Sequence, residues 1–113
     1  MSNEPVKTIC GSVYYPERIG LLPNSTLHVH LLDISLADAP AKELAAQITS
    51  NAEKAGLHFN LTYKLSDVLS GHTYAIRADI TCDNKLIYTT TQQHPVALGV
   101  DYVKGQEVLV SRV

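Results

Sequence analysis

The amino-acid sequence predicts an all-β protein that folds as one domain. Most of its segments alternate apolar and polar residues, which is the two-residue period of half-buried strands. The segments are short, and turn residues separate them. A chain of 113 residues has the usual size of a single domain. Six or seven short strands with antiparallel hairpins are typical of a β-sandwich or a closed barrel.

The segment 26–40, T-L-H-V-H-L-L-D-I-S-L-A-D-A-P, is predicted to form a central strand. Apolar residues occupy every second position over Leu27–Leu31, so one face of the strand is apolar. The alternation breaks near Asp33, which predicts a bulge or a change of exposure there. Pro40 ends the segment because proline has no amide hydrogen to add to a strand ladder.

A first strand is predicted over Val6–Tyr15, which is rich in β-forming residues. Gly11 lies inside this strand, and an internal glycine marks either a bulge or the close approach of another backbone. Pro16 ends the strand and begins a loop that leads to the central strand. Apolar residues of the loop are expected to fold back onto the sheet, and they are Ile19, Leu21 and Leu22.

The segment 41–55 fits two predictions. Its residues are strong helix formers, Leu44 and Ile48 lie four apart, and Gly56 suits a helix C-terminus. The same segment also alternates, with Leu44, Ala46 and Ile48 on one face of a strand. The residue pattern alone does not decide between helix and strand.

Four further strands are predicted, over Leu57–Lys64, Tyr74–Cys82, Leu86–Thr91 and Glu107–Arg112. The turn Asp83-Asn84-Lys85 joins the second of these strands to the third, because Asn84 tolerates a positive φ angle. Between the first two strands, the segment 65–71 is expected to hold one helical turn with Ser66 as its cap.

Charge and hydropathy argue against two classes of partner. The formal net charge is −2 and the basic residues are scattered, so no basic stripe for nucleic acid is present. No apolar run reaches the length of about 18 residues that a membrane-spanning helix requires. The first nine residues also lack the basic start and apolar core of an export signal. No cofactor is predicted.

The two cysteines, Cys10 and Cys82, are too few for a disulfide scaffold and too far apart for a C-x-x-C site. One interpretation is a pair of half-buried thiols, because free cysteine behaves as a small apolar residue. The other is a possible disulfide between two strands in an oxidising compartment. Such a bridge would close a loop of about 70 residues and stabilise the fold by about 4 kcal/mol.

Several segments follow one another in the order of a known family. They are G-S-V-Y-Y-P-E-R-I-G-L-L-P (11–23), L-x-V-x-L-L-D-I-S-L-A-D-A-P (27–40), F-N-L-T-Y (59–63), Y-A-I-R-A-D-I (74–80) and H-P-V (94–96). Over about residues 8–98 the chain resembles the YbaY/YscW family of small bacterial envelope lipoproteins, which includes type III secretion pilotins. The motif D-I-S-L-A-D-A-P is the most specific part of this resemblance. Residues 99–113 lie outside it as a C-terminal strand or tail.

The resemblance implies a single antiparallel β-sandwich of about seven short strands over residues 1–113, with a strand in the segment 41–55. Pilotins of this type bind a secretin subunit and help it reach and assemble in the outer membrane. The resemblance therefore implies a non-enzymatic binding module whose partner is a secretin or another outer-membrane component. The implied location is the periplasm or outer membrane if an export signal has been removed, and the cytoplasm if Met1 is the native start.

Two groups of residues are candidates for a site. Apolar residues of two loops are predicted to line one partner-binding groove, although they also fit a structural role at the ends of a sandwich, and they are Ile19, Leu21, Leu22, Leu65, Val68 and Leu69. Arg18, Asp33 and Asp38 are predicted to fix the loop before Pro40, because acidic residues beside a proline usually bind local backbone amides. Arg18 is expected to pair with one of the two carboxylates.

Metal binding and catalysis receive less support. His28 and His30 project from one strand face and would need a third ligand, such as His58 or Asp79, to hold a metal ion. Solvent-facing strand histidines are more common, so no metal site is predicted. No serine lies in a G-x-S-x-G motif, so nucleophilic catalysis is not expected.

Three functions remain open on the sequence. The first is the pilotin-like binding module. The second is a structural or stress-related envelope protein without a dedicated client. The third, an enzyme or a glycan-binding domain, is disfavoured because tryptophan is absent and no acid and base pair is apparent.

Overall fold

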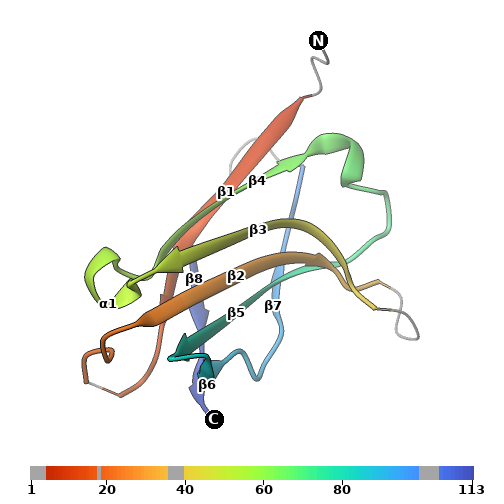
Figure 1. The fold of residues 1–113 in the computed structure, drawn as a ribbon. Coiled ribbons are helices and arrows are strands. Elements are labelled where there is room, and N and C mark those ends of the chain that lie inside the picture. Colours follow the sequence, from red (N-terminus) through yellow and green to blue (C-terminus); the bar gives the residue numbers. More distant parts are fainter. Residues whose placement is uncertain (1–4, 18, 36–39, 100–104) are drawn as a thin grey trace.

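Two β-sheets pack face to face in the computed structural model, which describes residues 5–17, 19–35, 40–99 and 105–113 (Figure 1). One sheet has three strands in the order β4-β1-β8, and the other has the order β3-β2-β5-β6-β9 with β7 also paired to β5. The elements are β1 Val6–Tyr14, β2 Ser25–Asp33, β3 Lys42–Ser50, α1 Ala52–Ala55, β4 His58–Lys64, the 3-10 turn η1 Leu65–Asp67, β5 Tyr74–Cys82, β6 Lys85–Thr89, β7 His94–Val96, β8 Gln106–Leu109 and β9 Ser111–Arg112. The all-β prediction is confirmed.

Strand β2 lies inside the larger sheet, between β3 and β5, as the pattern of its residues predicted. Leu27, Val29 and Leu31 are completely buried on its inner face. The pairing with β3 shifts register between Leu31 and Leu32, where the partner changes from Ala45 to Glu43. The predicted irregularity near the end of this strand is therefore confirmed.

The segment 41–55 is mainly a strand. Residues of β3 pair with β2 along almost its whole length, and helix forms only in the four residues of α1. Gly56 ends α1 with a positive φ of 94°, a conformation that glycine adopts without steric cost. Ladder hydrogen bonds and burial against β2 thus outweigh a helix propensity that amounts to tenths of a kcal/mol per residue.

The C-terminal strand differs from the prediction. Instead of one strand over Glu107–Arg112, β8 pairs parallel with β1 and β9 pairs antiparallel with β6, so the chain crosses between the sheets at the buried Val110. The described residues form nine strands rather than about seven, because this division and β7 add to the number. A Cβ atom on Gly11 would lie only 2.0 Å from the carbonyl oxygen of Gln106, which confirms the predicted close approach of another backbone.

Two local predictions have different outcomes. Asp83 and Asn84 have positive φ angles of 50° and 67° and form the two-residue turn between β5 and β6, as predicted. The helical turn is also present as η1, but Ser66 lies inside it rather than at its cap. Lys64 occupies the N-cap position, and its side chain does not cap the turn.

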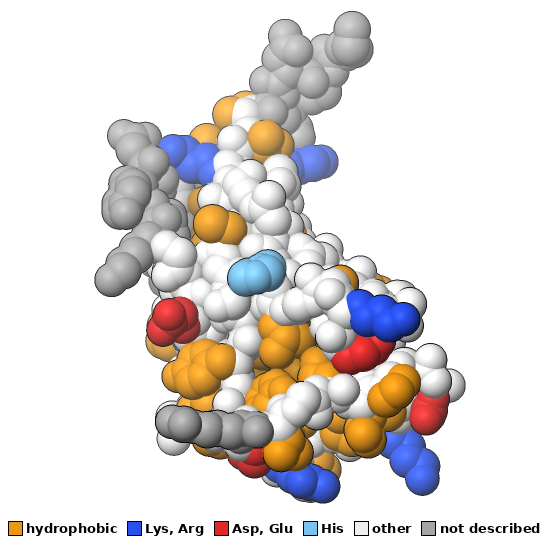
Figure 2. All heavy atoms as spheres, turned by 90° about the vertical axis from the view of Figure 1, so that its left-hand side faces the viewer, with side chains coloured by type: hydrophobic (Ala, Val, Ile, Leu, Met, Phe, Trp, Pro, Cys, Tyr) orange, Lys and Arg blue, Asp and Glu red, His pale blue; other side chains and the backbone are white. Residues whose placement is uncertain are grey.

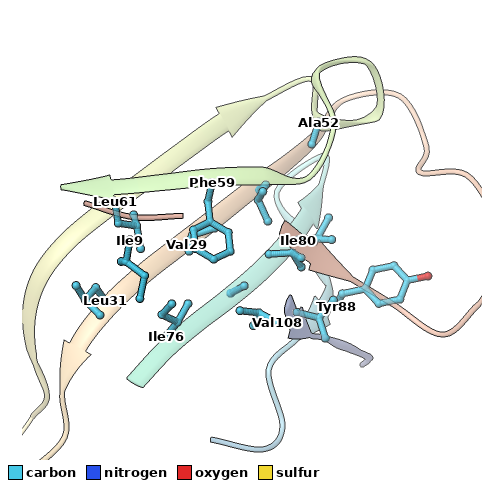
Figure 3. Close-up of a cluster of buried hydrophobic side chains, with 14 of the residues drawn as sticks. Ile9, Val29, Leu31, Ala52, Phe59, Leu61, Ile76, Ile80, Tyr88 and Val108 are labelled. Atoms are coloured by element: carbon cyan, nitrogen blue, oxygen red, sulfur yellow. The ribbon is translucent and has the colours of Figure 1, made fainter. Parts of the chain in front are cut away.

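The hydrophobic core lies between the sheets (Figure 3). The three-stranded sheet contributes Ile9 and Phe59, and the larger sheet contributes Val29, Ile76 and Ile80. All five are at most 3% exposed. Because these side chains fill the space between the sheets, sites for ligands are expected at the loops, the outer faces and the edges.

The side chain of Gln47 links the two sheets along one side of the sandwich. Its Nε2 donates to the carbonyl oxygen of His58 at 3.0 Å, and its Oε1 accepts from the amide of Asn60 at 2.8 Å. One side-chain amide therefore satisfies two backbone groups of β4 that β1 does not bind.

No helix in the described residues has the length and hydropathy to span a membrane.

Candidate partner-binding surfaces

The six apolar residues predicted to line one groove lie at opposite ends of the sandwich. Lys64, just before η1, pairs with Val6 at one end of β1, whereas the loop that contains Ile19 follows Tyr14 at the other end. A strand of this length spans about 26 Å, so the two loops cannot share one groove. Leu69 and Ile19 thus belong to two separate clusters.

The upper cluster surrounds η1 and the loop after β7. It consists of Val68, Leu69, Tyr74, Val96 and Leu98, and lines a hollow of about 440 Å³. Leu69 is 49% exposed, whereas Val68 and Leu98 pack partly against the core. Leu65, which was predicted to belong to the same surface, also packs partly against the core and does not line the hollow.

Two buried tyrosines hold the loops of the upper cluster. The amide of Leu69 donates to the hydroxyl of Tyr74 at 2.7 Å, and the amide of Gly99 donates to the hydroxyl of Tyr63 at 3.0 Å. Tyr63 and Tyr74 are 1% and 4% exposed, so their hydroxyl groups are fixed by packing of the rings. The backbone on both sides of the hollow is thereby tied to the core.

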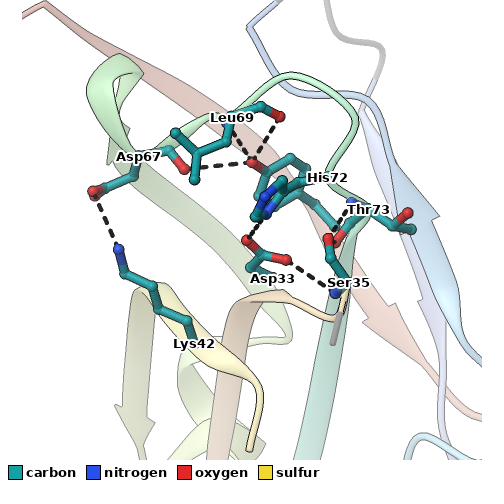
Figure 4. Close-up of polar contacts among 8 residues, drawn as sticks. Asp33, Ser35, Lys42, Asp67, Leu69, His72 and Thr73 are labelled. Atoms are coloured by element: carbon teal, nitrogen blue, oxygen red, sulfur yellow. Dashed lines mark hydrogen bonds and ion pairs between the residues drawn. The ribbon is translucent and has the colours of Figure 1, made fainter. Parts of the chain in front are cut away.

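A polar network supports the same loop (Figure 4). The carboxylate of Asp33 contacts Nδ1 of His72 at 2.6 Å and accepts from the amide of Ser35 at 3.0 Å. The amide of Thr73 donates to the hydroxyl of Ser35 at 2.7 Å. Hydrogen bonding by Ser35, followed by hydrogen bonding by His72, lowers the pKa of Asp33 from 3.8 to about 2. The end of β2 is thus joined to the loop before β5.

Of the three residues predicted to fix the loop before Pro40, the structure describes only Asp33. Asp33 binds a local backbone amide, as expected of an acidic residue near a proline, and its side-chain partner is His72. Arg18 and Asp38 lie outside the described residues. An exposed ion pair of 3.7 Å between Lys42 and Asp67 connects β3 to η1, and a pair of this kind contributes little to stability.

The lower cluster lies at the other end of the sandwich, where hydrophobic side chains gather near the bottom of the face in Figure 2. It consists of Ile19, Leu21, Leu22, Ile87 and Tyr88, and lines a hollow of only about 80 Å³. Leu22 is 62% exposed and Ile19 is 55% exposed. The lower cluster thus exposes more apolar surface over a much smaller hollow.

Aromatic packing holds the loop of the lower cluster. The rings of Tyr15 and Tyr88 stack with centroids 4.7 Å apart, and the Tyr15 hydroxyl donates to the carbonyl oxygen of Ile19 at 2.5 Å. Burial, and after it the nearby carboxylate of Glu17, raises the pKa of Tyr88. Packing of the rings therefore replaces the polar network found at the upper cluster.

The histidines discussed as metal ligands are dispersed. His30 contacts Glu43 at 2.5 Å, His28 lies opposite Asp79 in the sheet, and His58 belongs to the other sheet. Among the described residues, no group of three histidine, cysteine or acidic side chains is positioned to hold a metal ion.

Both cysteines are free thiols. Cys10 is exposed on β1 of the three-stranded sheet, whereas Cys82 ends β5 of the larger sheet. The thiol of Cys82 donates to the carbonyl oxygen of Pro23 at 3.4 Å. The disulfide between them is therefore not formed in this structure, in which the two thiols belong to different sheets.

His72 and Tyr74 are site residues that reasoning from the sequence missed. His72 follows a turn and is 39 positions from Asp33, so no local pattern joins them. Tyr74 was assigned only to a strand. A tyrosine on the apolar face of a predicted strand could have indicated this contact, because a buried tyrosine hydroxyl usually forms a hydrogen bond.

A small β-sandwich that exposes apolar clusters on its loops has the features of a protein-binding domain. A family model described as the type III secretion system lipoprotein chaperone (YscW) matches residues 4–105. The chain therefore belongs to the YscW family, and the resemblance found in the sequence is confirmed.

Two individual proteins are similar to this chain. The uncharacterized lipoprotein YbaY of Escherichia coli K12 is 33% identical over 89 residues, which are 78% of this chain and 47% of YbaY. The chain thus spans about half the length of that relative. An alternative pilotin from the type II secretion system of Vibrio cholerae is 35% identical, with a TM-score of 0.85 over 96% of this chain and 98% of the pilotin.

Proposed function

We propose that this protein is a pilotin-like accessory protein of the bacterial envelope, which binds a secretin subunit and assists its assembly in the outer membrane. The main support is the likeness to an alternative pilotin, which extends over nearly the full length of both chains. The chaperone description of the family agrees with a role in protein binding rather than catalysis.

We infer that the upper cluster is the surface that binds this client. Its hollow is the larger of the two, and hydrogen bonds to buried tyrosines fix its loops before a partner arrives. A preformed hollow lowers the ordering entropy that binding costs. Leu69 stands exposed at this hollow and is the expected anchor.

Pull-down with the C-terminal segment of a secretin from the same bacterium tests the proposal. Enrichment by the wild-type protein is expected, together with a loss of at least about tenfold on Leu69→Asp, because the anchor becomes charged. Leu86→Asp is the matched control, since Leu86 is 45% exposed on β6 and outside both clusters. Leu22→Asp tests the lower cluster in the same way.

The outcomes test the pilotin-like role separately from the choice of the upper cluster as the binding surface. Failure of the wild-type protein to enrich any secretin segment would contradict the pilotin-like role. Enrichment that survives Leu69→Asp but is lost on Leu22→Asp would keep the role and move the surface to the lower cluster.

A further inference from the structure

Strand β3 forms one edge of the six-stranded sheet. It is the outermost strand of the six-stranded sheet, and its outer edge pairs with no other strand among the described residues (Figure 1). Natural edge strands are usually protected by charges, prolines or bulges. Here Lys42, Glu43 and the register shift protect only the first part of the strand. The segment L-A-A-Q-I-T-S, residues 44–50, has no charge, proline or glycine.

The register determines which backbone groups lie on this outer edge. The amide of Ile34 donates to the carbonyl oxygen of Thr73, on the side of β2 that faces β5. Successive residues of a strand direct their backbone groups to opposite neighbours, so even-numbered residues of β2 bond to β5 and odd-numbered ones bond to β3. Odd-numbered residues of β3 therefore bond back to β2, through the pairs with Leu27, Val29 and Leu31. The amide and carbonyl groups of Ala46, Ile48 and Ser50 consequently point to the outer edge.

The side chains along this edge are ready for a further strand. Ile48 is 65% exposed on the outer face of the sheet, which is more than any other large hydrophobic residue of the strands. On the inner face, Gln47 is held by β4 and cannot turn outward to cover the edge. A strand that paired with β3 would satisfy the open backbone groups and bury part of Ile48.

We propose that two copies of this chain pair antiparallel along β3, with Ile48 opposite Ile48 of the partner subunit. This register is self-complementary about a two-fold axis, as a symmetric dimer requires. It brings the outward backbone groups of Ala46 opposite those of the partner subunit's Ser50, and the residues that pair strand to strand, 46–50, carry no charge.

A second copy suits this edge better than a disordered peptide. It presents an extended strand that is already ordered by its own sheet, so pairing costs no folding entropy for the strand. The contact joins two six-stranded sheets into one continuous sheet. It uses no residue of the upper or lower cluster, and so the inference does not depend on the proposed function.

Disulfide trapping tests the register directly. In a Cys10→Ser, Cys82→Ser background, Ile48→Cys is expected to form a covalent dimer on mild oxidation. Opposite residues in a hydrogen-bonded pair have Cα atoms about 5.5 Å apart, which suits a disulfide. Ala46→Cys is the matched control, because the two copies of residue 46 would lie about 13 Å apart in this register. Equal trapping of the two variants, or none for Ile48→Cys, would overturn the proposal.

Sedimentation analysis of the untagged wild-type chain gives an independent readout. Its mass is expected to rise with concentration from 12.3 kDa towards twice that value. Ile48→Lys is expected to weaken this association at least about tenfold, because the apolar contact on the axis is replaced by two like charges. Leu86→Lys, at an exposed position on another strand, should leave it unchanged. A wild-type chain that remains monomeric up to about 1 mM would rule out the dimer.

Discussion

The upper and lower clusters expose similar residues but are held in different ways. At the upper cluster, the hydroxyls of Tyr74 and Tyr63 accept hydrogen bonds from loop amides, and the Asp33–His72 pair joins a further loop to the sheet, around an open hollow. At the lower cluster, the rings of Tyr15 and Tyr88 stack, the Tyr15 hydroxyl bonds to the loop at Ile19, and the hollow measures only about 80 Å³. Exposed apolar side chains therefore do not by themselves define a site.

The anchoring of the loops explains this difference. Directional hydrogen bonds hold a backbone at its edges without filling the space between the loops. Side chains packed beneath a loop occupy that space instead, and the hollow at the lower cluster, which Tyr88 lines, measures only about 80 Å³. This difference supports the proposal that the upper cluster, rather than the lower one, binds the partner.

Removal of the buried ring should have the largest effect. Tyr88→Ala is expected to lower the free energy of unfolding by about 3 kcal/mol, because Tyr88 is 4% exposed and both the stack and core contacts are lost. Urea unfolding followed by circular dichroism measures this change. A loss below about 1 kcal/mol would show that the lower loop does not depend on aromatic packing.

Removal of single hydroxyl groups should separate the two clusters. Tyr74→Phe leaves the amide of Leu69 without its acceptor and is expected to cost about 1 to 2 kcal/mol. Tyr15→Phe should cost less, since Tyr15 is only half-buried and water can replace its hydroxyl at Ile19. Hydrogen exchange should show faster opening of the segment 65–73 for Tyr74→Phe alone. Equal effects of both variants would remove the distinction.

The smallest effect concerns pH and the network at Asp33. Its folded pKa of about 2 lies below the ordinary 3.8, so the network stabilises the protein fully above about pH 4 and loses this contribution as the pH falls towards 2. In Asp33→Asn, the urea midpoint should change less over that interval than in the wild type. Asp83→Asn, in an exposed turn, is the control. An unchanged pH dependence in Asp33→Asn would contradict this account.

Local patterns predicted most of the framework. The alternation around Val29, the turn at Asn84 and the close approach at Gly11 each follow from a few neighbouring residues, and the structure confirms all three. The segment 41–55 satisfied two periodicities at once, and only pairing with β2 decided for the strand.

The candidate site was predicted less completely, because its contacts join distant residues. Leu69 and Ile19 were recognised as exposed apolar residues, but their assignment to one groove was wrong. Their separation depends on the course of β1 between the two loops. The pairing of Asp33 with His72 likewise appears only when β2 and β5 lie side by side.

The sequence by itself determined the all-β class, the central strand, the tight turn and the family of this protein. These features depend on side-chain periodicity and on the backbone preferences of single residues, which act over a few positions. The tertiary structure alone decided the crossing of the last strand between the sheets, the division of the apolar residues into two clusters and the open edge at β3. Such features arise from packing and hydrogen bonding between segments far apart in the chain, and no local pattern encodes which distant backbone or side chain a residue will meet.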